Sequence, residues 1–178
     1  MTPKTLRQAP PRTFLPLASF LNSQVEAGRI PGAVVAVGRR DGIAYLAAFG
    51  ARAVKPRRER ITERTVFDLA SLTKVMVTAP LVVERAVRGA LSLEDPLERH
   101  LEETRGTLVG AIPLELLLTH TAGFPADNPI SDYRRGKSRL YAAIAAEPLE
   151  APSGTRFTYS DVGYVLLQGV IERATGRR

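Results

Sequence analysis

The chain contains no cysteine, no tryptophan and only two histidines, His100 and His120, among its 178 residues. The absence of cysteine excludes disulfide bonds, thiolate nucleophiles and cysteine-ligated zinc. Neither histidine belongs to a metal-ligand spacing such as H-E-x-x-H. We therefore expect neither a metal site nor a cofactor.

Long apolar stretches are also absent. No run reaches the 18 or so residues that a membrane-spanning helix needs, so no membrane partner is predicted. Residues 14–21 are apolar and follow several basic residues, as in a signal peptide, but they include Pro16 and Ser19 and precede no small-x-small cleavage site. An amphipathic helix explains them better. We predict a cytoplasmic location, with the periplasm as the alternative.

Acidic residues are in the minority, 18 against 25 basic ones, which gives a net charge of +7. The basic residues gather in 52–64, 134–139 and 177–178, and such patches can bind nucleic acid. However, no aromatic residues interleave with them, and Glu59 and Glu63 interrupt the first patch. We therefore predict a solvated basic surface and no nucleic-acid partner, although the positive field would favour small anionic substrates.

Length and composition indicate one domain. With 44% hydrophobic residues the chain can bury a core, and it is too short for two independent domains. Residues 1–13 carry three prolines and are predicted to be a flexible lead-in before a domain at 14–178. Helical spacing is predicted for 14–28, and a hairpin for 33–37 and 43–49, because Asp41-Gly42 suits a turn whose two residues tolerate positive φ. Residues 51–65 look charged and irregular.

The second half of the sequence is predicted to be mainly helical. Residues 71–88 are apolar on nearly all sides, which is typical of a buried helix. Pro80 should kink this helix and Gly89 should end it. Further helices are expected at 97–101, 114–118, 140–146 and 162–174, with a loop at 121–139. The order predicts an α+β fold, an N-terminal hairpin followed by a mainly helical layer.

The segment Ser71-Leu-Thr-Lys74 is the first candidate for chemistry. Residues three apart share a helix face, so the lysine can reach the serine hydroxyl. A lysine in an apolar site can have its pKa lowered enough to act as a base. The alternative is a helix N-cap serine beside a lysine that reaches out to solvent, and the residues alone leave both open.

Two further segments carry polar groups. In Tyr159-Ser160-Asp161, the phenol could exchange a proton with a leaving group and Asp161 could bind substrate or Lys74. On local pattern alone, a turn in which Asp161 caps the last helix is favoured. His120 could be a general base, but a structural histidine at a helix end is the better interpretation.

The sequence resembles the superfamily of serine β-lactamases and penicillin-binding proteins. The resemblance is carried by Phe67 to Lys74, which is similar to the nucleophile segment, and by three later blocks in the expected order. These blocks are 93–101, 117–124 and 152–167, and residues 30–35 with the hairpin resemble the opening strands. The resemblance covers the chain from about Phe14 to its end.

This resemblance implies a β-lactamase-like (transpeptidase-like) fold and a serine hydrolase without a cofactor. Ser71 would be the acylated nucleophile, Lys74 its proton acceptor, and Tyr159 the acid or base that serves the leaving group. Which of Lys74 and Tyr159 deprotonates Ser71 stays open. The substrate would be an ester or an amide, whether a β-lactam, a short-chain ester or a D-alanyl peptide.

The sequence departs from the family pattern in two places. Asp161 stands where many members have asparagine, which puts the substrate contact in doubt. No K-T-G or H-x-G segment follows, so we expect an incomplete, N-terminal part of the fold. This expectation includes little activity alone, and either self-association or a complementary C-terminal segment as partner. The alternative function is an inert or ligand-binding chain of the same fold.

Overall fold

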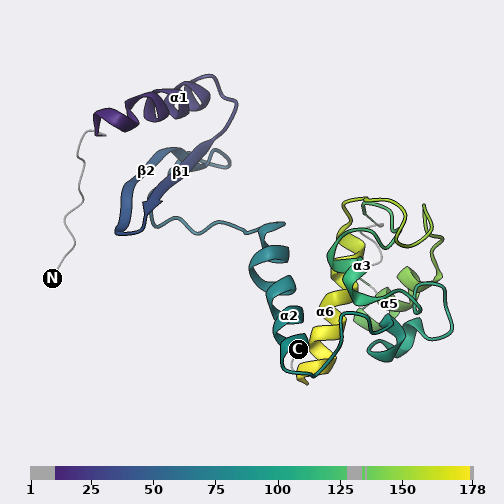
Figure 1. Ribbon diagram of the computed structural model, residues 1–178. Coiled ribbons are helices and arrows are strands. Elements are labelled where there is room, and N and C mark those ends of the chain that lie inside the picture. Colours follow the sequence, from purple (N-terminus) through teal and green to yellow (C-terminus); the bar gives the residue numbers. More distant parts are fainter. Residues whose placement is uncertain (1–10, 128–133, 135, 177–178) are drawn as a thin grey trace. The chain divides into compact units, whose positions relative to one another are not determined.

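The computed structural model describes residues 11–127, 134 and 136–176. It contains two compact units, Met1–Asp68 and Leu69–Arg178, which are described separately below. Most of the predicted lead-in, and part of the loop predicted at 121–139, lie outside the described residues (Figure 1). None of the described helices has the length and hydropathy that crossing a membrane requires.

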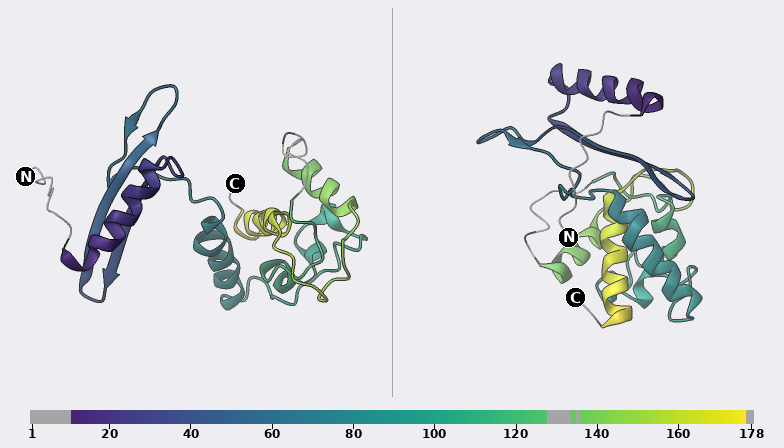
Figure 2. Two further views of the ribbon diagram at one scale, coloured as in Figure 1. Left: turned by 90° about the horizontal axis from the view of Figure 1, so that it is seen from above. Right: turned by 90° about the vertical axis from the view of Figure 1, so that its left-hand side faces the viewer.

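The first unit is a helix on a hairpin. A 3₁₀ turn at Arg12–Phe14 leads into α1 (Leu15–Glu26), and Gly28, with φ of +68°, ends it in the left-handed conformation. Helix α1 lies over one face of the hairpin (Figure 2), and apolar side chains of the two elements pack together. Phe14 stacks on Tyr45 with ring centroids 4.7 Å apart. The sequence predicted this helix and its stop correctly.

The hairpin pairs β1 (Gly32–Arg39) with β2 (Gly42–Ala53) in antiparallel register, and β3 (Glu59–Arg60) extends the sheet in the order β1-β2-β3. The hairpin prediction is confirmed, but only Gly42 of the Asp41-Gly42 pair has positive φ. The register shifts between Val37 and Gly38, so a bulge accommodates the turn instead. The prediction that 51–65 is irregular was wrong in part, since β2 continues to Ala53 and pairs with β3.

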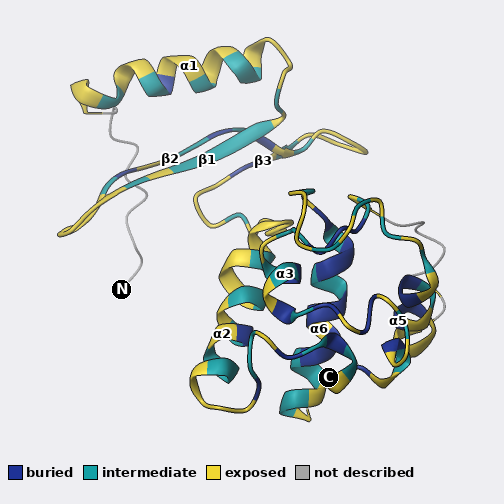
Figure 3. Ribbon diagram, turned by 45° about the vertical axis from the view of Figure 1, so that its right-hand side comes forward, coloured by how far each residue is buried: buried dark blue, intermediate teal, exposed yellow. Residues whose placement is uncertain are grey.

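The second unit packs around α6 (Asp161–Thr175), whose buried residues are dark blue in Figure 3. Its neighbours are α2 (Ala79–Val87), α3 (Leu114–Leu118) and α5 (Lys137–Ala146). A 3₁₀ turn, η3 (Leu97–Arg99), stands where a short helix was predicted at 97–101, and a second, η4 (Glu102–Thr104), follows it. The helices predicted at 114–118 and 162–174 are confirmed. Together these elements enclose the larger apolar core.

The helical run after Ser71 differs from its prediction. Of residues 71–88 only Val82 is buried, so the expectation of a buried helix was wrong for this structure. Within its unit this run contacts α6 along one side, which leaves Val75, Met76 and Val87 exposed. The composition of a helix reports its apolar character and not which elements cover it.

Pro80 has the local effect that its chemistry requires. It lacks an N–H and its ring crowds the preceding turn. The structure accommodates it with a π-helical turn, η2 (Lys74–Thr78), in which the Ala79 N–H donates to the Lys74 carbonyl five residues back. The helix then continues as α2 and ends at Gly89, with φ of +69°, as predicted.

Leu166 tests the contribution of the α6 core to stability. Its side chain is fully buried, and replacing it by alanine removes apolar contacts and leaves a cavity. We expect Leu166→Ala to lower the free energy of unfolding by about 2–5 kcal/mol. The matched control is Leu108→Ala, because Leu108 is 85% exposed and its loss should cost under about 0.5 kcal/mol. Urea unfolding followed by circular dichroism measures both, and equal effects would contradict this core assignment.

Candidate active site

Ser71 begins the helical run in a strained segment. The preceding Ala70 has φ of +44°, a left-handed conformation that non-glycine residues rarely adopt. Such strain persists only where the surrounding structure enforces it, and it is concentrated at functional sites. After Ala70 the chain turns helical at once, because the Lys74 N–H donates to the Ser71 carbonyl at 3.1 Å. The Ser71 side chain is therefore presented at the start of a helix and exposed to solvent.

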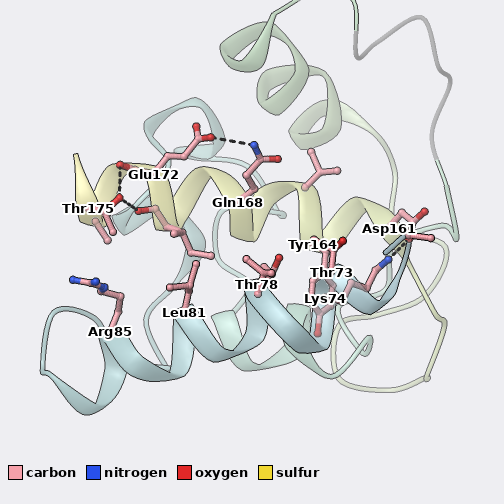
Figure 4. Close-up of a pocket in the computed structure, with 15 residues that line it drawn as sticks. Thr73, Lys74, Thr78, Leu81, Arg85, Asp161, Tyr164, Gln168, Glu172 and Thr175 are labelled. Carbon is pink, nitrogen blue, oxygen red and sulfur yellow. Dashed lines mark hydrogen bonds and ion pairs between the residues drawn. The ribbon is translucent and has the colours of Figure 1, made fainter. Parts of the chain in front are cut away.

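Lys74 lies one helical turn after Ser71 on the same face. Its Nζ donates to Ser71 Oγ at 3.2 Å, so the structure brings together the two residues that the sequence paired. The Lys74 side chain is only 12% exposed although most of its neighbours along the helical run are exposed. It is turned toward α6 and away from water (Figure 4).

Asp161 meets Lys74 from the start of α6. Its Oδ1 accepts from Lys74 Nζ at 2.5 Å, across 87 residues of sequence. The prediction that Asp161 caps this helix was wrong, because Ser160 does so: Ser160 Oγ accepts from the Val162 N–H at 3.2 Å. Ser160 is buried and also donates to the Pro125 carbonyl at 2.6 Å. The cap on Ser160 leaves the Asp161 carboxylate available to Lys74.

Aromatic rings surround the lysine ammonium. Lys74 Nζ lies 5.0 Å from the centroid of the Tyr159 ring and 5.6 Å from that of Tyr164, within the range of cation–π attraction. Sequence reasoning singled out Tyr159 but missed Tyr164, one turn into α6. The helical spacing from Asp161 to Tyr164 was the available signal, since residues three apart share a face.

His120 holds the Tyr159 segment in place. Its Nδ1 accepts from the Ser160 N–H at 3.1 Å, and its carbonyl accepts from the Thr158 N–H at 2.9 Å. Its ring lies 4.5 Å from the Tyr159 ring and stacks on Tyr164 at 5.0 Å. Burial and the nearby Lys74 charge lower the pKa of His120, so it is neutral at pH 7. These contacts fit the structural role that the sequence favoured.

The electrostatics separate the two candidate bases. Burial pulls the pKa of Lys74 down, but the hydrogen bonds to Asp161 and Tyr159 outweigh it, and the pKa is raised above 10.5. The expectation of a lowered lysine pKa was therefore wrong, because it overlooked Asp161. The pKa of Tyr159 is lowered, since hydrogen bonds from Ser71 and then from Lys74 stabilise its phenolate. The structure thus favours a cationic lysine beside a more acidic phenol.

A cavity of about 1030 Å³ runs between α2 and α6 (Figure 4). Lys74 and Asp161 lie at one end of it and Arg85 and Thr175 at the other, with apolar side chains such as Leu81 between them. Among the described residues, no group of three His, Asp or Glu side chains is arranged to hold a metal ion. Of the site residues predicted from the sequence, Lys74 and Asp161 line this cavity, whereas Ser71 and Tyr159 are not among the residues that line it.

Comparison with known proteins places the chain in a family. A model of the family described as "Beta-lactamase" matches residues 17–178, which is most of the chain. The chain belongs to the β-lactamase family. The β-lactamase-like α+β fold implied by the sequence is thereby confirmed, and solved structures of the same fold agree with it.

Individual relatives are distant. An Escherichia coli O157:H7 protein, provisionally named a D-alanyl-D-alanine carboxypeptidase, is 29% identical over 89% of this chain and 41% of its own length. An N-acetylmuramyl-L-alanine amidase of Bacillus subtilis is 27% identical over 89% of this chain and 40% of its own. The crystal structure of a β-lactamase/D-alanine carboxypeptidase from Pseudomonas syringae is 26% identical, with a TM-score of 0.76 over 92% of this chain and 46% of that one. The chain spans about two fifths of the length of the curated relatives.

Proposed function

We propose that this β-lactamase-family chain carries the nucleophile and the proton-transfer groups of a serine hydrolase that cleaves esters or amides through an acyl-enzyme on Ser71. One observation carries the proposal: Lys74 Nζ donates both to Ser71 Oγ and to Asp161, and it lies 5.0 Å from the centroid of the Tyr159 ring. Interactions with Ser71 and Lys74 lower the pKa of the Tyr159 phenol. A serine needs an adjacent base to become a nucleophile, and this cluster supplies one. The names of the relatives, carboxypeptidase, amidase and β-lactamase, support an acyl-transfer reaction.

Tyr159 is the general base in this proposal. The phenolate takes the proton of Ser71 Oγ as that oxygen forms a bond to the substrate's carbonyl carbon. The protonated phenol then gives the proton to the leaving alkoxide or amine as the tetrahedral intermediate collapses. Water attacks the acyl-enzyme by the same route in reverse and releases the acid. The Ser71 N–H, at the start of the helical run, donates to the developing oxyanion.

Lys74 acts as a fixed cation in this scheme. Its ammonium donates to Ser71 Oγ and stabilises both the phenolate and the alkoxide, and Asp161 keeps it protonated. No step consumes a cofactor. The partner is a small ester or amide, and the electropositive chain favours one with an anionic group.

The pH dependence of acylation distinguishes the two bases. If Tyr159 is the base, the rate of Ser71 acylation rises with pH along a limb centred below 10, because its pKa is lowered from that value. If Lys74 is the base, the rate rises only above pH 10.5, because the pKa of Lys74 is raised above that value. Acylation by p-nitrophenyl acetate, an uncharged ester, measures the limb after subtraction of spontaneous hydrolysis.

Asp161→Asn gives this pH profile a second test. The Asp161 charge raises the pKa of Tyr159, so its removal should move the rising limb to lower pH. Asp41→Asn makes the same change of charge in the exposed hairpin turn and should leave the limb in place. A limb that stays in place or moves to higher pH in Asp161→Asn would contradict the assignment of Tyr159.

Turnover decides between the proposal and the ligand-binding alternative. The chain is incubated with p-nitrophenyl acetate and with nitrocefin, and both product release and the mass of the intact protein are recorded. An acyl adduct followed by multiple turnovers supports a hydrolase. A stable stoichiometric adduct without turnover supports a chain that binds acyl ligands. Light scattering on the same sample measures its oligomeric state.

A further inference from the structure

His120 follows α3 in a backbone conformation that suits glycine better. Its φ is +59°, in the left-handed region that non-glycine residues rarely adopt. Glycine is the usual residue where a helix ends in this conformation, because it has no Cβ to crowd the backbone. Strain of this kind is concentrated at functional sites. The contacts of the His120 ring go to residues 157, 159, 160 and 164, in and beside the segment that carries Tyr159.

His120 holds the backbone on both sides of Tyr159. The Thr158 N–H donates to the His120 carbonyl at 2.9 Å, and the Ser160 N–H donates to His120 Nδ1 at 3.1 Å. Tyr159 lies between these two donors in the sequence, and its ring is 4.5 Å from the His120 ring. Because Tyr159 is 45% exposed, packing alone holds it weakly. We therefore expect the contacts with His120 to set the position of the phenol.

The hydrogen bond to Ser160 requires a neutral histidine ring. Nδ1 accepts a hydrogen bond only while it carries no proton, so the proton of the neutral ring lies on Nε2. Addition of a second proton would set an Nδ1–H against the Ser160 N–H. Two donors cannot bond to each other, so protonation of His120 would break this contact.

The surroundings of the ring determine where this protonation occurs. Burial and then the Lys74 ammonium lower the pKa of His120 below 6.5, despite the nearby Asp161 carboxylate. Two further titratable groups, Tyr159 and Tyr164, face the ring at centroid distances of 4.5 and 5.0 Å, and neither carries a positive charge in any form. His120 is therefore neutral near pH 7 and becomes charged in acid.

We propose that His120 is a positioning residue that holds the base Tyr159 in place through its neutral Nδ1, and that protonation of the ring in acid releases Tyr159 from Ser71. This inference rests on the proposed function, since it requires Tyr159 to accept the Ser71 proton. It adds a second proton to the pH dependence. The acylation rate falls about tenfold per pH unit as the phenolate is lost, and by about a further tenfold per unit once His120 is protonated.

The acid side of the pH profile tests this inference. Acylation of Ser71 by p-nitrophenyl acetate is followed by intact mass, from neutral pH down to the pH at which the chain unfolds. In the wild type, the slope of log rate against pH should steepen from about one to about two below pH 6.5. His120→Asn should keep a slope of about one, because its amide oxygen accepts from the Ser160 N–H at every pH and asparagine tolerates the left-handed backbone. The control His100→Asn changes the other histidine and should keep the wild-type steepening.

A variant without an acceptor tests whether His120 acts through Tyr159. His120→Gly suits the backbone and removes the ring, so at neutral pH its acylation should be about 10–10²-fold slower than that of His120→Asn. In a Tyr159→Phe background the same two variants should differ little, because no phenol is left to position. Thermal unfolding of each variant identifies any loss of folding.

The outcomes separate this inference from the proposed function. The inference is overturned if the wild type and His120→Asn have the same profile down to the pH of unfolding. It is also overturned if His120→Gly slows acylation equally with and without the Tyr159 phenol. Both results leave Ser71 chemistry intact. A wild-type chain that is acylated at no pH overturns the proposed function itself.

Discussion

Replacement of Ser71 by alanine is expected to reduce ester turnover by at least about 10³-fold, because removing a nucleophile that acts within a catalytic group removes nearly all of the group's effect. Lys74 Nζ donates to Ser71 Oγ, and Ser71 is the leading cause of the lowered pKa of Tyr159. Initial rates with p-nitrophenyl acetate measure the loss. The Ser71→Ala variant should fold normally, since the Ser71 side chain is exposed and its backbone carbonyl makes the helical hydrogen bond.

The control for Ser71 is another exposed helical serine. Ser19 lies on α1 in the first unit, and Ser19→Ala should leave the rate unchanged. Ser160 is unsuitable as a control because it caps α6. Turnover that survives in Ser71→Ala at a tenth or more of the wild-type rate would show that another group carries the reaction.

Replacement of Lys74 by methionine or of Tyr159 by phenylalanine is expected to lower the rate of Ser71 acylation by at least about 10²-fold, the usual contribution of positioned proton transfer. The two side chains share one hydrogen-bonded cluster with Ser71, and each alters the pKa of the other. Once one of these two side chains is removed, the other contributes less to the rate of Ser71 acylation. The double variant should therefore be little slower than the slower single variant.

The non-additivity of these losses is the informative quantity. Stopped-flow acylation of the two single variants and the double variant gives a double-mutant cycle. Losses that multiply would indicate that Tyr159 only packs against Lys74. Lys55→Met, which removes an exposed lysine of the first unit, should change nothing. Thermal unfolding of each variant separates a catalytic loss from a folding one, because the Asp161 charge is left unpaired without Lys74.

Local sequence patterns predicted most of the elements. The helical spacing of apolar residues predicted α1, α3 and α6. The glycines at 28 and 89 predicted two of the helix ends. Both signals act within a few residues of sequence. The strand β3 was missed, since Glu59 and Arg60 have weak strand propensity. Their pairing with β2 stabilises a conformation that the local sequence does not specify.

The site shows the same division between local and distant information. The pairing of Ser71 with Lys74 follows from one turn of helix, so the spacing predicted it. The sequence favoured Asp161 as the cap of the last helix, and this was wrong because the neighbouring Ser160 belongs to a residue type that caps helices equally well. The raised pKa of Lys74 was predicted in the wrong direction, since it depends on a carboxylate 87 residues away. Electrostatics of this kind requires the tertiary structure.

The site of covalent modification tests the central claim most directly. The chain is treated with a fluorophosphonate and, separately, with a penicillin, and the adduct is located by peptide mapping with tandem mass spectrometry. We predict a single adduct on Ser71 with each reagent, absent after Ser71→Ala. An adduct on Ser153 or Ser160 with Ser71 unmodified, or no adduct with either reagent, would contradict the assignment of Ser71 as the nucleophile.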